Sequence, residues 1–104
     1  MYATSRRYEA IDQARTSELI KKAEGTLVPR LSKLPGFNGY SLIEDGHGVL
    51  SSVGYFDTAA HADESTRVAS SWMRDEKLEA ALPTAPTVTT GEVVVHETRE
   101  FVKA

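Results

Sequence analysis

The chain of 104 residues is long enough for one modest core, and its composition, 40% hydrophobic and 26% charged, is that of a globular protein. It has no cysteine, which excludes disulfides, thiolate catalysis and iron–sulfur ligation. The net charge of −3 without a basic stripe argues against nucleic-acid binding, and no apolar run approaches the roughly 20 residues of a membrane helix. With no secretory signal visible either, we expect one domain over residues 1–104 in a soluble, cytoplasmic protein.

The first third of the chain predicts a strand followed by an interrupted helix. Residues 2–11 alternate loosely and include two tyrosines, which indicates a strand. Thr16 and Ser17 offer an N-cap for a helix with apolar residues at spacings of three and four: Ile20, Ala23, Leu27, Leu31 and Leu34. Pro29 lies within this pattern, but Gly25, four residues earlier, lacks a Cβ and lets the backbone adjust. We therefore expect a kinked or broken helix.

A turn and a hairpin are predicted next. Pro35 ends the helix, and Gly36 can supply a positive φ where the chain turns. Two strand patterns follow, over residues 37–44 and 49–56, and the turn signal Asp45-Gly46-His47-Gly48 joins them. The two strands are therefore expected to pair as an antiparallel hairpin.

The remainder predicts a second helix and a last strand. Asp57 or Thr58 caps a helix that carries Trp72 on its apolar side, runs to about Leu82 and stops at Pro83. A linker rich in proline and threonine follows, and GEVVVHE (91–97), extended a few residues either way, is the last strand. The order β-α-β-β-α-β is that of the ferredoxin-like α+β fold with an antiparallel sheet. Right-handed crossovers place the fourth strand on the edge beside the first, with both helices on one face.

Apolar residues are predicted on both faces of this sheet. In the second strand, alternation places Phe37 and Ile43 opposite to Tyr40 and Leu42, and the third and fourth strands show similar patterns. A monomer seldom exposes an apolar patch of this size. We therefore expect a homodimer, in which a second copy covers the open face. The alternative is a monomer whose edge distortion and long polar side chains hide the patch.

A family resemblance rests on LPGFNGY (34–40), YFDTAAHADES (55–65), Trp72 and GEVVV (91–95). These stretches resemble the antibiotic biosynthesis monooxygenase (ABM)-like family of the dimeric α+β barrel superfamily. The resemblance implies a homodimer with sheets packed face to face, and a pocket in each subunit between helices and sheet. The superfamily includes cofactor-independent oxygenases acting on polycyclic phenols, haem-degrading enzymes and proteins with no assigned activity.

The resemblance is incomplete at the positions that carry chemistry. The oxygenases have a tryptophan in the second helix and an asparagine one turn earlier; Trp72 matches the first, whereas Val68 occupies the second position. The haem-degrading enzymes pair an asparagine on the first strand with a histidine after the tryptophan. This chain has no asparagine on the first strand and no histidine between Trp72 and Val95. Haem binding is therefore less expected than cofactor-free chemistry.

The candidate site residues lie on the second helix and the hairpin. His61, Ser65, Val68 and Trp72 share one helical stripe. Trp72 is either a core residue or a pocket wall on which a flat ligand stacks. His61 is either a general base or a partly exposed surface histidine. Two phenols, Tyr40 and Tyr55, could face a pocket or lie buried at an interface.

The other polar residues offer weaker candidates. Asn38 could stand in for the missing asparagine, His47 is expected to be solvated, and His96 faces either the barrel or solvent. The histidines have no metal-ligand spacing, so we expect neither a metal site nor a cofactor.

Two main functional hypotheses follow. The first is a cofactor-independent monooxygenase-like protein that binds a small hydrophobic, aromatic molecule beside Trp72. The second is a non-catalytic ligand-binding or stress-associated homodimer. The sequence leaves open whether the protein is an enzyme, and which substrate it would use.

Overall fold

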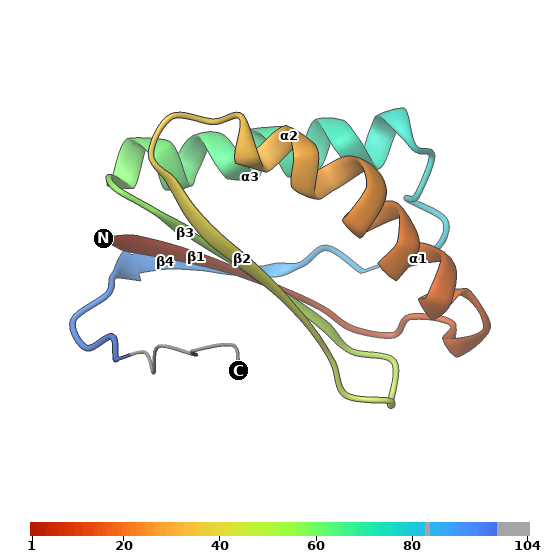
Figure 1. Cartoon of the computed structure of the whole chain (residues 1–104). Helices are drawn as coiled ribbons and strands as arrows, with labels where there is room; N and C mark the ends of the chain where they lie inside the picture. Colours follow the sequence, from red (N-terminus) through yellow and green to blue (C-terminus); the bar gives the residue numbers. More distant parts are fainter. Residues whose placement is uncertain (83, 98–104) are drawn as a thin grey trace, which may run out of the picture.

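A layer of helices lies over one face of a four-stranded antiparallel sheet (Figure 1). The computed structural model describes residues 1–82 and 84–97. The strands follow the order β2-β3-β1-β4, with bounds Phe37–Glu44, Leu50–Phe56, Tyr2–Tyr8 and Thr87–Glu92 in that order. The predicted ferredoxin-like α+β fold is confirmed, including the position of β4 beside β1. Both helical segments also lie on the same face, as the right-handed crossovers require.

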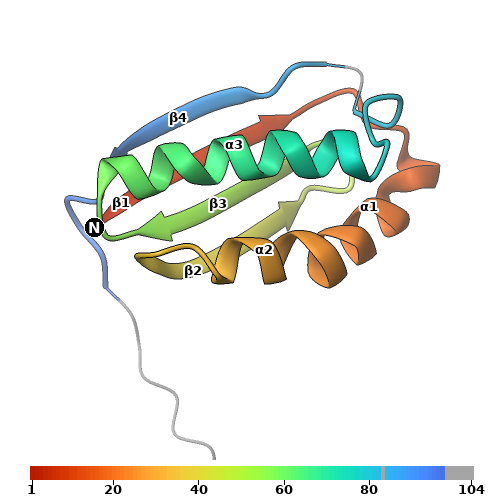
Figure 2. The ribbon, with the colours of Figure 1, turned by 90° about the horizontal axis from the view of Figure 1, so that it is seen from above.

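The helices cover the sheet unevenly. Seen from above in Figure 2, α3 lies over β1 and β3, α2 lies along β2, and β4 meets α3 only at one end. The helical elements are the short 3₁₀ turn η1 (Gln13–Arg15), α1 (Thr16–Lys22), the π turn η2 (Ala23–Leu27), α2 (Val28–Ser32) and α3 (Ala59–Asp75). Within the described residues, no helix is long and apolar enough to cross a membrane.

The first helical segment is interrupted where the sequence predicts it. The Val28 N–H donates to the Ala23 carbonyl five residues earlier, which is the bonding pattern of a π turn. Pro29 lies in the first turn of α2, where a missing N–H costs little. The predicted cap at Thr16 is wrong, because the chain enters the helix earlier, through η1. There the Asp12 side chain accepts from the Ala14 N–H at 3.0 Å.

A bulge near the start of β2 corrects the predicted side-chain directions. Phe37 pairs with Phe56, and the register shifts by one residue before Gly39 pairs with Tyr55. The extra residue brings Phe37 onto the same face as Tyr40, whereas simple alternation puts them on opposite faces. Phe37 packs edge-on against the buried Phe56, with ring centroids 5.9 Å apart.

The second helix begins as predicted and ends earlier. Thr58 is the N-cap, and its side chain accepts from the His61 N–H at 3.2 Å. The helix ends at Asp75, because Lys77 has a left-handed φ of 56° and the Leu78 N–H closes the end by donating to the Met73 carbonyl at 2.9 Å. Leu78 then turns back into the core.

The last strand begins and ends several residues earlier than the predicted 91–97 and overlaps it at Gly91 and Glu92. It covers 87–92, most of which the sequence suggested as linker, and the Thr4 and Thr90 hydroxyls meet at 2.9 Å across the β1–β4 pair. The Val93 N–H still donates to the Met1 carbonyl, at 2.8 Å. Beyond that point the partner strand has ended, and Val94 and Val95 are each 83% exposed.

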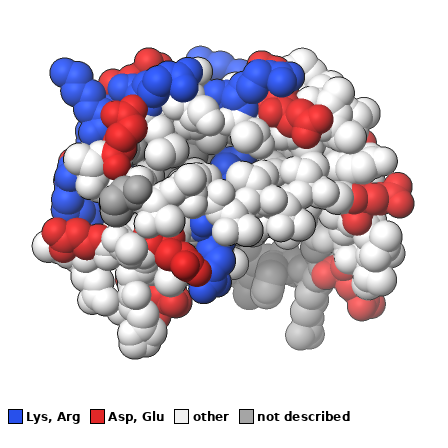
Figure 3. Space-filling view, turned by 180° about the vertical axis from the view of Figure 1, so that it is seen from behind, with Lys and Arg blue, Asp and Glu red and all other residues white. Residues whose placement is uncertain are grey.

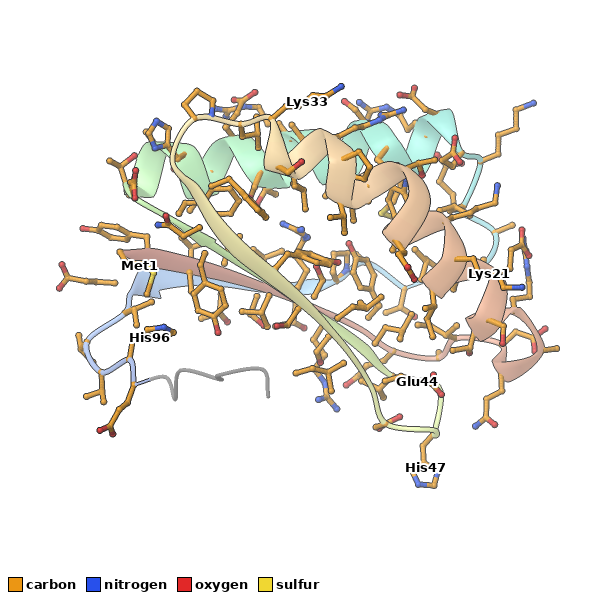
Figure 4. All side chains as sticks on the ribbon, in the orientation of Figure 1. Met1, Lys21, Lys33, Glu44, His47 and His96 are labelled. Carbon is orange, nitrogen blue, oxygen red and sulfur yellow. The ribbon has the colours of Figure 1, made fainter. Side chains whose placement is uncertain are left out.

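The face of the sheet opposite the helices is less apolar than predicted. Phe37 lies on the other face and the valines lie beyond β4, which leaves Ile43, Val53 and Tyr55 among small residues such as Ala3 and Ser5. Residues 93–97 leave the end of β4 and descend below the level of the sheet at its edge (Figure 1). His96 lies below the sheet in Figure 4, with its ring centroid 5.8 Å from that of Tyr55. Covering of this face by a second copy stays a prediction.

The turn between α2 and β2 requires a glycine. Gly36 has φ 75°, and a Cβ there would overlap the ring of His61. Gly36→Ala should therefore lower the free energy of unfolding by more than the about 1–2 kcal/mol of left-handed strain. Gly46→Ala is the matched control, since Gly46 also has a positive φ but has open space around it. Urea denaturation measures both. Equal losses would contradict a steric role for the Gly36–His61 contact.

Candidate ligand-binding cavity

A cavity of about 30 Å³ lies between the helix layer and the sheet. Strands β1, β2 and β3, the first helical segment and α3 contribute to it. Most of its lining is apolar and comes from Leu19, Ala23, Leu27, Leu42, Leu50, Ala69, Trp72 and Leu82. The remaining lining residues are polar and come from the sheet: Arg6, Tyr8, Tyr40 and Ser52. The surface that faces the cavity is therefore mainly apolar, and the polar residues of its lining lie on the sheet side.

Arg6 is the charged residue of this lining. Alternation along β1 turns Thr4, Arg6 and Tyr8 toward the helices, and the Arg6 residue is only 2% exposed. Its Nη2 donates to Ser52 Oγ at 3.4 Å, and Ser52 Oγ donates in turn to Tyr40 Oη at 2.9 Å. Arg6 Nε and Nη1 are buried and have no hydrogen-bond partner among the described residues. Two donor nitrogens of a buried cation thus remain unused.

No carboxylate of the described chain neutralises Arg6. The ion pairs found there all lie at the surface, and none of them includes Arg6. Taking an ion out of water costs several kcal/mol even after the protein relaxes, unless a partner compensates it. The site therefore carries a stability cost that packing alone does not explain.

The two phenols beside Arg6 remain protonated at neutral pH. Burial raises the pKa of Tyr8, while the positive charge of Arg6 acts in the opposite direction. Burial likewise raises the pKa of Tyr40, partly offset by the Ser52 hydrogen bond and then by Arg6. Because Tyr40 Oη accepts from Ser52, its own O–H is available to donate to a ligand.

Trp72 forms one wall of the cavity and also connects two helices. It is 5% exposed, and its Nε1–H donates to Thr26 Oγ1 at 2.6 Å. The Thr26 hydroxyl donates to the Lys22 carbonyl, also at 2.6 Å. Thr26 lies in the π turn, so this chain of bonds connects α3 to the irregular part of the first helix. Trp72 is packed in the core and lines the cavity, and stacking of a ligand on it stays a prediction.

The structure separates the residues that the sequence groups together. Trp72 and Tyr40 line the cavity, whereas Tyr55 points to the opposite face of the sheet. Ser65 is buried and donates to the Ala62 carbonyl at 2.6 Å, one turn back on α3. Val68 borders an open hollow at the surface, lined mainly by charged and polar side chains.

The other polar candidates also lie outside the cavity lining. His61 lies at the start of α3 with its Nδ1 buried beside Gly36, so it stands at the α2–β2 joint. Asn38 Nδ2 donates to Asp57 Oδ1 at 2.9 Å on the surface. His47 is at the tip of the β2–β3 turn, where Figure 4 shows it pointing away from the molecule. Its predicted exposure is confirmed.

Sequence reasoning did not identify Arg6, Tyr8 and Ser52 as site residues. Arg6 stands out in the sequence only as part of the Arg6-Arg7 pair, which suggests two solvated charges. The available signal was the alternation of β1: if Tyr8 points inward, Arg6 does too, and Arg7 points outward. Alternation from Leu50 and Phe56 would have placed Ser52 inward in the same way.

A groove adjoins the cavity on the side of the first helix. It has a volume of about 210 Å³ and shares Ala23, Tyr40 and Leu42 with the cavity lining. Ile20 and Val28 add further apolar surface, and Glu24 is its charged residue. The two hollows are therefore neighbours with common lining residues.

Charges elsewhere do not define a second site. In Figure 3, Lys and Arg side chains lie mainly along the helix layer with acidic residues among them, and charges of both signs are scattered over the rest of that face. No cluster of three or more potential metal ligands occurs within residues 1–82 and 84–97.

Comparisons with known proteins match the fold. No protein-family model and no curated protein sequence matches the chain. A protein of unknown function from Nitrosomonas europaea has 14% identity and a TM-score of 0.74, with 96% of this chain and 95% of that one covered. A dimeric ferredoxin-like protein from an uncultured marine organism has 16% identity and a TM-score of 0.70, with coverages of 95% and 92%.

A monooxygenase is among the similar structures. The Streptomyces coelicolor monooxygenase from the gene ActVA-Orf6, solved in complex with Nanaomycin D, has 12% identity and a TM-score of 0.72. The match covers 95% of this chain and 92% of that one. At such low identities, these similarities show a shared fold, of the kind found in monooxygenases, and leave the activity of this chain to its own residues.

The buried phenols of Tyr8 and Tyr40 should make the free energy of unfolding depend on pH in the alkaline range. As the pH rises past the ordinary tyrosine value of 10.0, the unfolded chain loses phenol protons that the folded state retains. The stabilising contribution is complete below that pH and is lost as the pH rises toward the folded-state pKa values. Tyr8→Phe and Tyr40→Phe should each weaken this dependence in urea denaturation at several alkaline pH values. An unchanged dependence in both variants would contradict the burial of these phenols.

The Trp72–Thr26 bond should contribute measurably to stability. Thr26→Val leaves the indole N–H buried without a partner, so the free energy of unfolding should fall by about 1–3 kcal/mol. Thr26→Ser keeps the hydroxyl and is the matched control. Denaturation followed by the fluorescence of Trp72, which is the only tryptophan in the sequence, measures both. Equal destabilisation by valine and serine would argue that packing, and not the hydrogen bond, holds α3 to the π turn.

Proposed function

We propose that this protein is a cofactor-independent, monooxygenase-like enzyme that binds a small aromatic molecule between its helices and sheet. The observation that supports this most strongly is the apolar cavity, with Trp72 as an aromatic wall and with Arg6 and Tyr40 among its lining residues. Fold similarity to a monooxygenase agrees with the proposal and does not by itself carry it.

The cavity suits a reaction in which the substrate itself supplies the electrons. An electron-rich phenol that loses a proton can transfer electrons to O₂. Oxidation of a ring CH₂ group to a carbonyl then incorporates one atom of O₂ and releases the other as water. The reaction therefore needs no external reductant. Arg6 would stabilise the substrate oxyanion by its charge, and the Tyr40 O–H would donate to it. Trp72 would hold the ring plane by stacking.

The dimensions of the site limit how such a substrate lies. A cavity of 30 Å³ has room for about one or two water molecules, which is less than an aromatic ring requires. The adjoining groove of 210 Å³ shares Tyr40 and Leu42 with it. We propose that the reacting end of the substrate enters the cavity and the rest of its body occupies the groove.

Ligand binding without turnover is the second candidate. It is favoured by the cavity lining, in which the described residues place no histidine or carboxylate side chain that could act as a general base. Val68 also replaces the asparagine of the resembling oxygenases and lies outside the cavity lining. A haem role has less support, since the same lining offers no histidine to ligate iron.

Oxygen consumption with hydroquinones and related polycyclic phenols tests the enzymatic proposal. Tyr40→Phe should lower kcat by roughly 10²-fold, because it removes a donor to the developing oxyanion. Tyr55→Phe is the matched control, as it makes the same change on the neighbouring strand but on the opposite face of the sheet. Binding without oxygen uptake on a broad panel would favour the second candidate. Loss of activity in Tyr55→Phe but not in Tyr40→Phe would contradict this assignment of the site.

We also propose that the protein forms a homodimer through the face of the sheet opposite the helices. Ile43, which is 56% exposed, and Val53 and Tyr55 lie on that face, and one structure with the same fold is a dimeric protein. Light scattering at micromolar concentration should give the mass of two chains. Val53→Lys should shift this mass toward one chain, while Lys33→Glu, on the helix side, should not. A monomer mass for the native protein would refute the proposal.

A further inference from the structure

We infer that the ligand of this cavity is an organic anion, whose charged oxygen binds Arg6 and whose apolar body extends into the groove beside Tyr40 and Leu42. The chemical class is a small, largely apolar molecule with one carboxylate or phenolate group. The inference rests on the proposed ligand site, and it is independent of whether the ligand is then turned over.

Arg6 leaves two hydrogen-bond donors unused. Its guanidinium is buried, one nitrogen donates to Ser52 at 3.4 Å, and Nε and Nη1 have no partner among the described residues. Buried donors in folded proteins are nearly always satisfied, and each exception calls for a physical reason. An acceptor brought by a ligand supplies that reason here, because both nitrogens belong to a residue that lines the cavity.

The positive charge of Arg6 has no compensating negative charge among the groups that it contacts. The guanidinium is permanently positive, and the groups with which it interacts, Ser52, Tyr8 and Tyr40, are neutral at physiological pH. One or two water molecules in the 30 Å³ cavity could accept hydrogen bonds, but they would not neutralise the charge. Ionic oxygen acceptors form shorter and stronger bonds to guanidinium than neutral ones do. The unfilled requirement of the site is therefore a negative charge.

The residues of the groove determine which end of the ligand lies at Arg6. The groove offers Ile20, Val28 and Leu42 as apolar surface, and its charged residue is Glu24. A ligand with its anionic group in the groove would face that carboxylate, whereas the reverse orientation places the anion at Arg6. The ligand therefore enters with its charged end first. Near this end, the free O–H of Tyr40 offers a further donor.

A pair of isosteric ligands tests the inference directly. Naphthoate and naphthamide share size and ring system and differ in charge. Isothermal titration calorimetry, with Trp72 fluorescence as a second signal, should show that the native protein binds naphthoate at least about ten-fold more tightly. Arg6→Met, which keeps the length of the side chain without its charge, should abolish this preference, so that naphthoate and naphthamide bind with similar affinity. Tyr55→Phe should retain the preference.

Naphthol distinguishes a site for a carboxylate from a site for a phenolate. If the site accepts phenolates, the affinity for naphthol should rise as the pH approaches its ionisation range, and Arg6→Met should remove this rise. Preference for naphthoate alone would identify a carboxylate site. Either result supports an anionic ligand, and the absence of both overturns it.

The outcomes also separate this inference from the proposed function. Equal binding of naphthoate and naphthamide, with no pH effect on naphthol, would leave an aromatic site but overturn the anion. Failure of all three ligands to bind would overturn both. Stability gives an independent check, because removing an uncompensated buried charge should raise the Tm of Arg6→Met in the absence of ligand. A large fall in Tm would mean that Arg6 has a structural partner, and it would also overturn the inference.

Discussion

The burial of one guanidinium organises the interior of this molecule. Arg6 points from an inner strand of the sheet into the space below the helices, and no carboxylate of the described chain approaches it. Desolvating this charge opposes folding, so the surrounding apolar packing has to offset it. Ser52, Tyr8 and Tyr40 form a neutral polar end around the charge, and leucines complete the cavity. Such an uncompensated local cost is more typical of functional sites than of structural cores.

The irregularity of the first helix shapes the other side of the cavity. Pro29 cannot donate to the carbonyl of Gly25, and the chain responds with the π turn over Ala23–Leu27. Ala23 and Leu27 from this turn line the cavity, and Thr26 accepts the indole N–H of Trp72. A local backbone constraint visible in the sequence is thus connected, through one hydrogen bond, to the aromatic wall of the proposed ligand site. π turns of this kind often lie at functional sites.

Most of the fold follows from the sequence, because periodicity and turn residues act locally. The hairpin strands, the Thr58 cap and the turn at Gly36 are at or within one residue of the predicted places. The errors arise where pairing over long sequence distances decides. The last strand lies at 87–92 because it must match the extent of β1, and the β2 bulge is fixed by pairing with β3. Arg6 was overlooked as a site residue because its significance depends on the lack of a partner in three dimensions.

The position and the hydrogen-bond partner of the Arg6 guanidinium are the central claim. A high-resolution crystal structure with naphthoate tests both directly. We predict that the guanidinium remains between sheet and helices, with a carboxylate oxygen within hydrogen-bond distance of Nε or Nη1 and the rings in the groove beside Tyr40. A guanidinium that pairs with a carboxylate of the protein, or that turns out to solvent while the ligand lies elsewhere, would contradict the account.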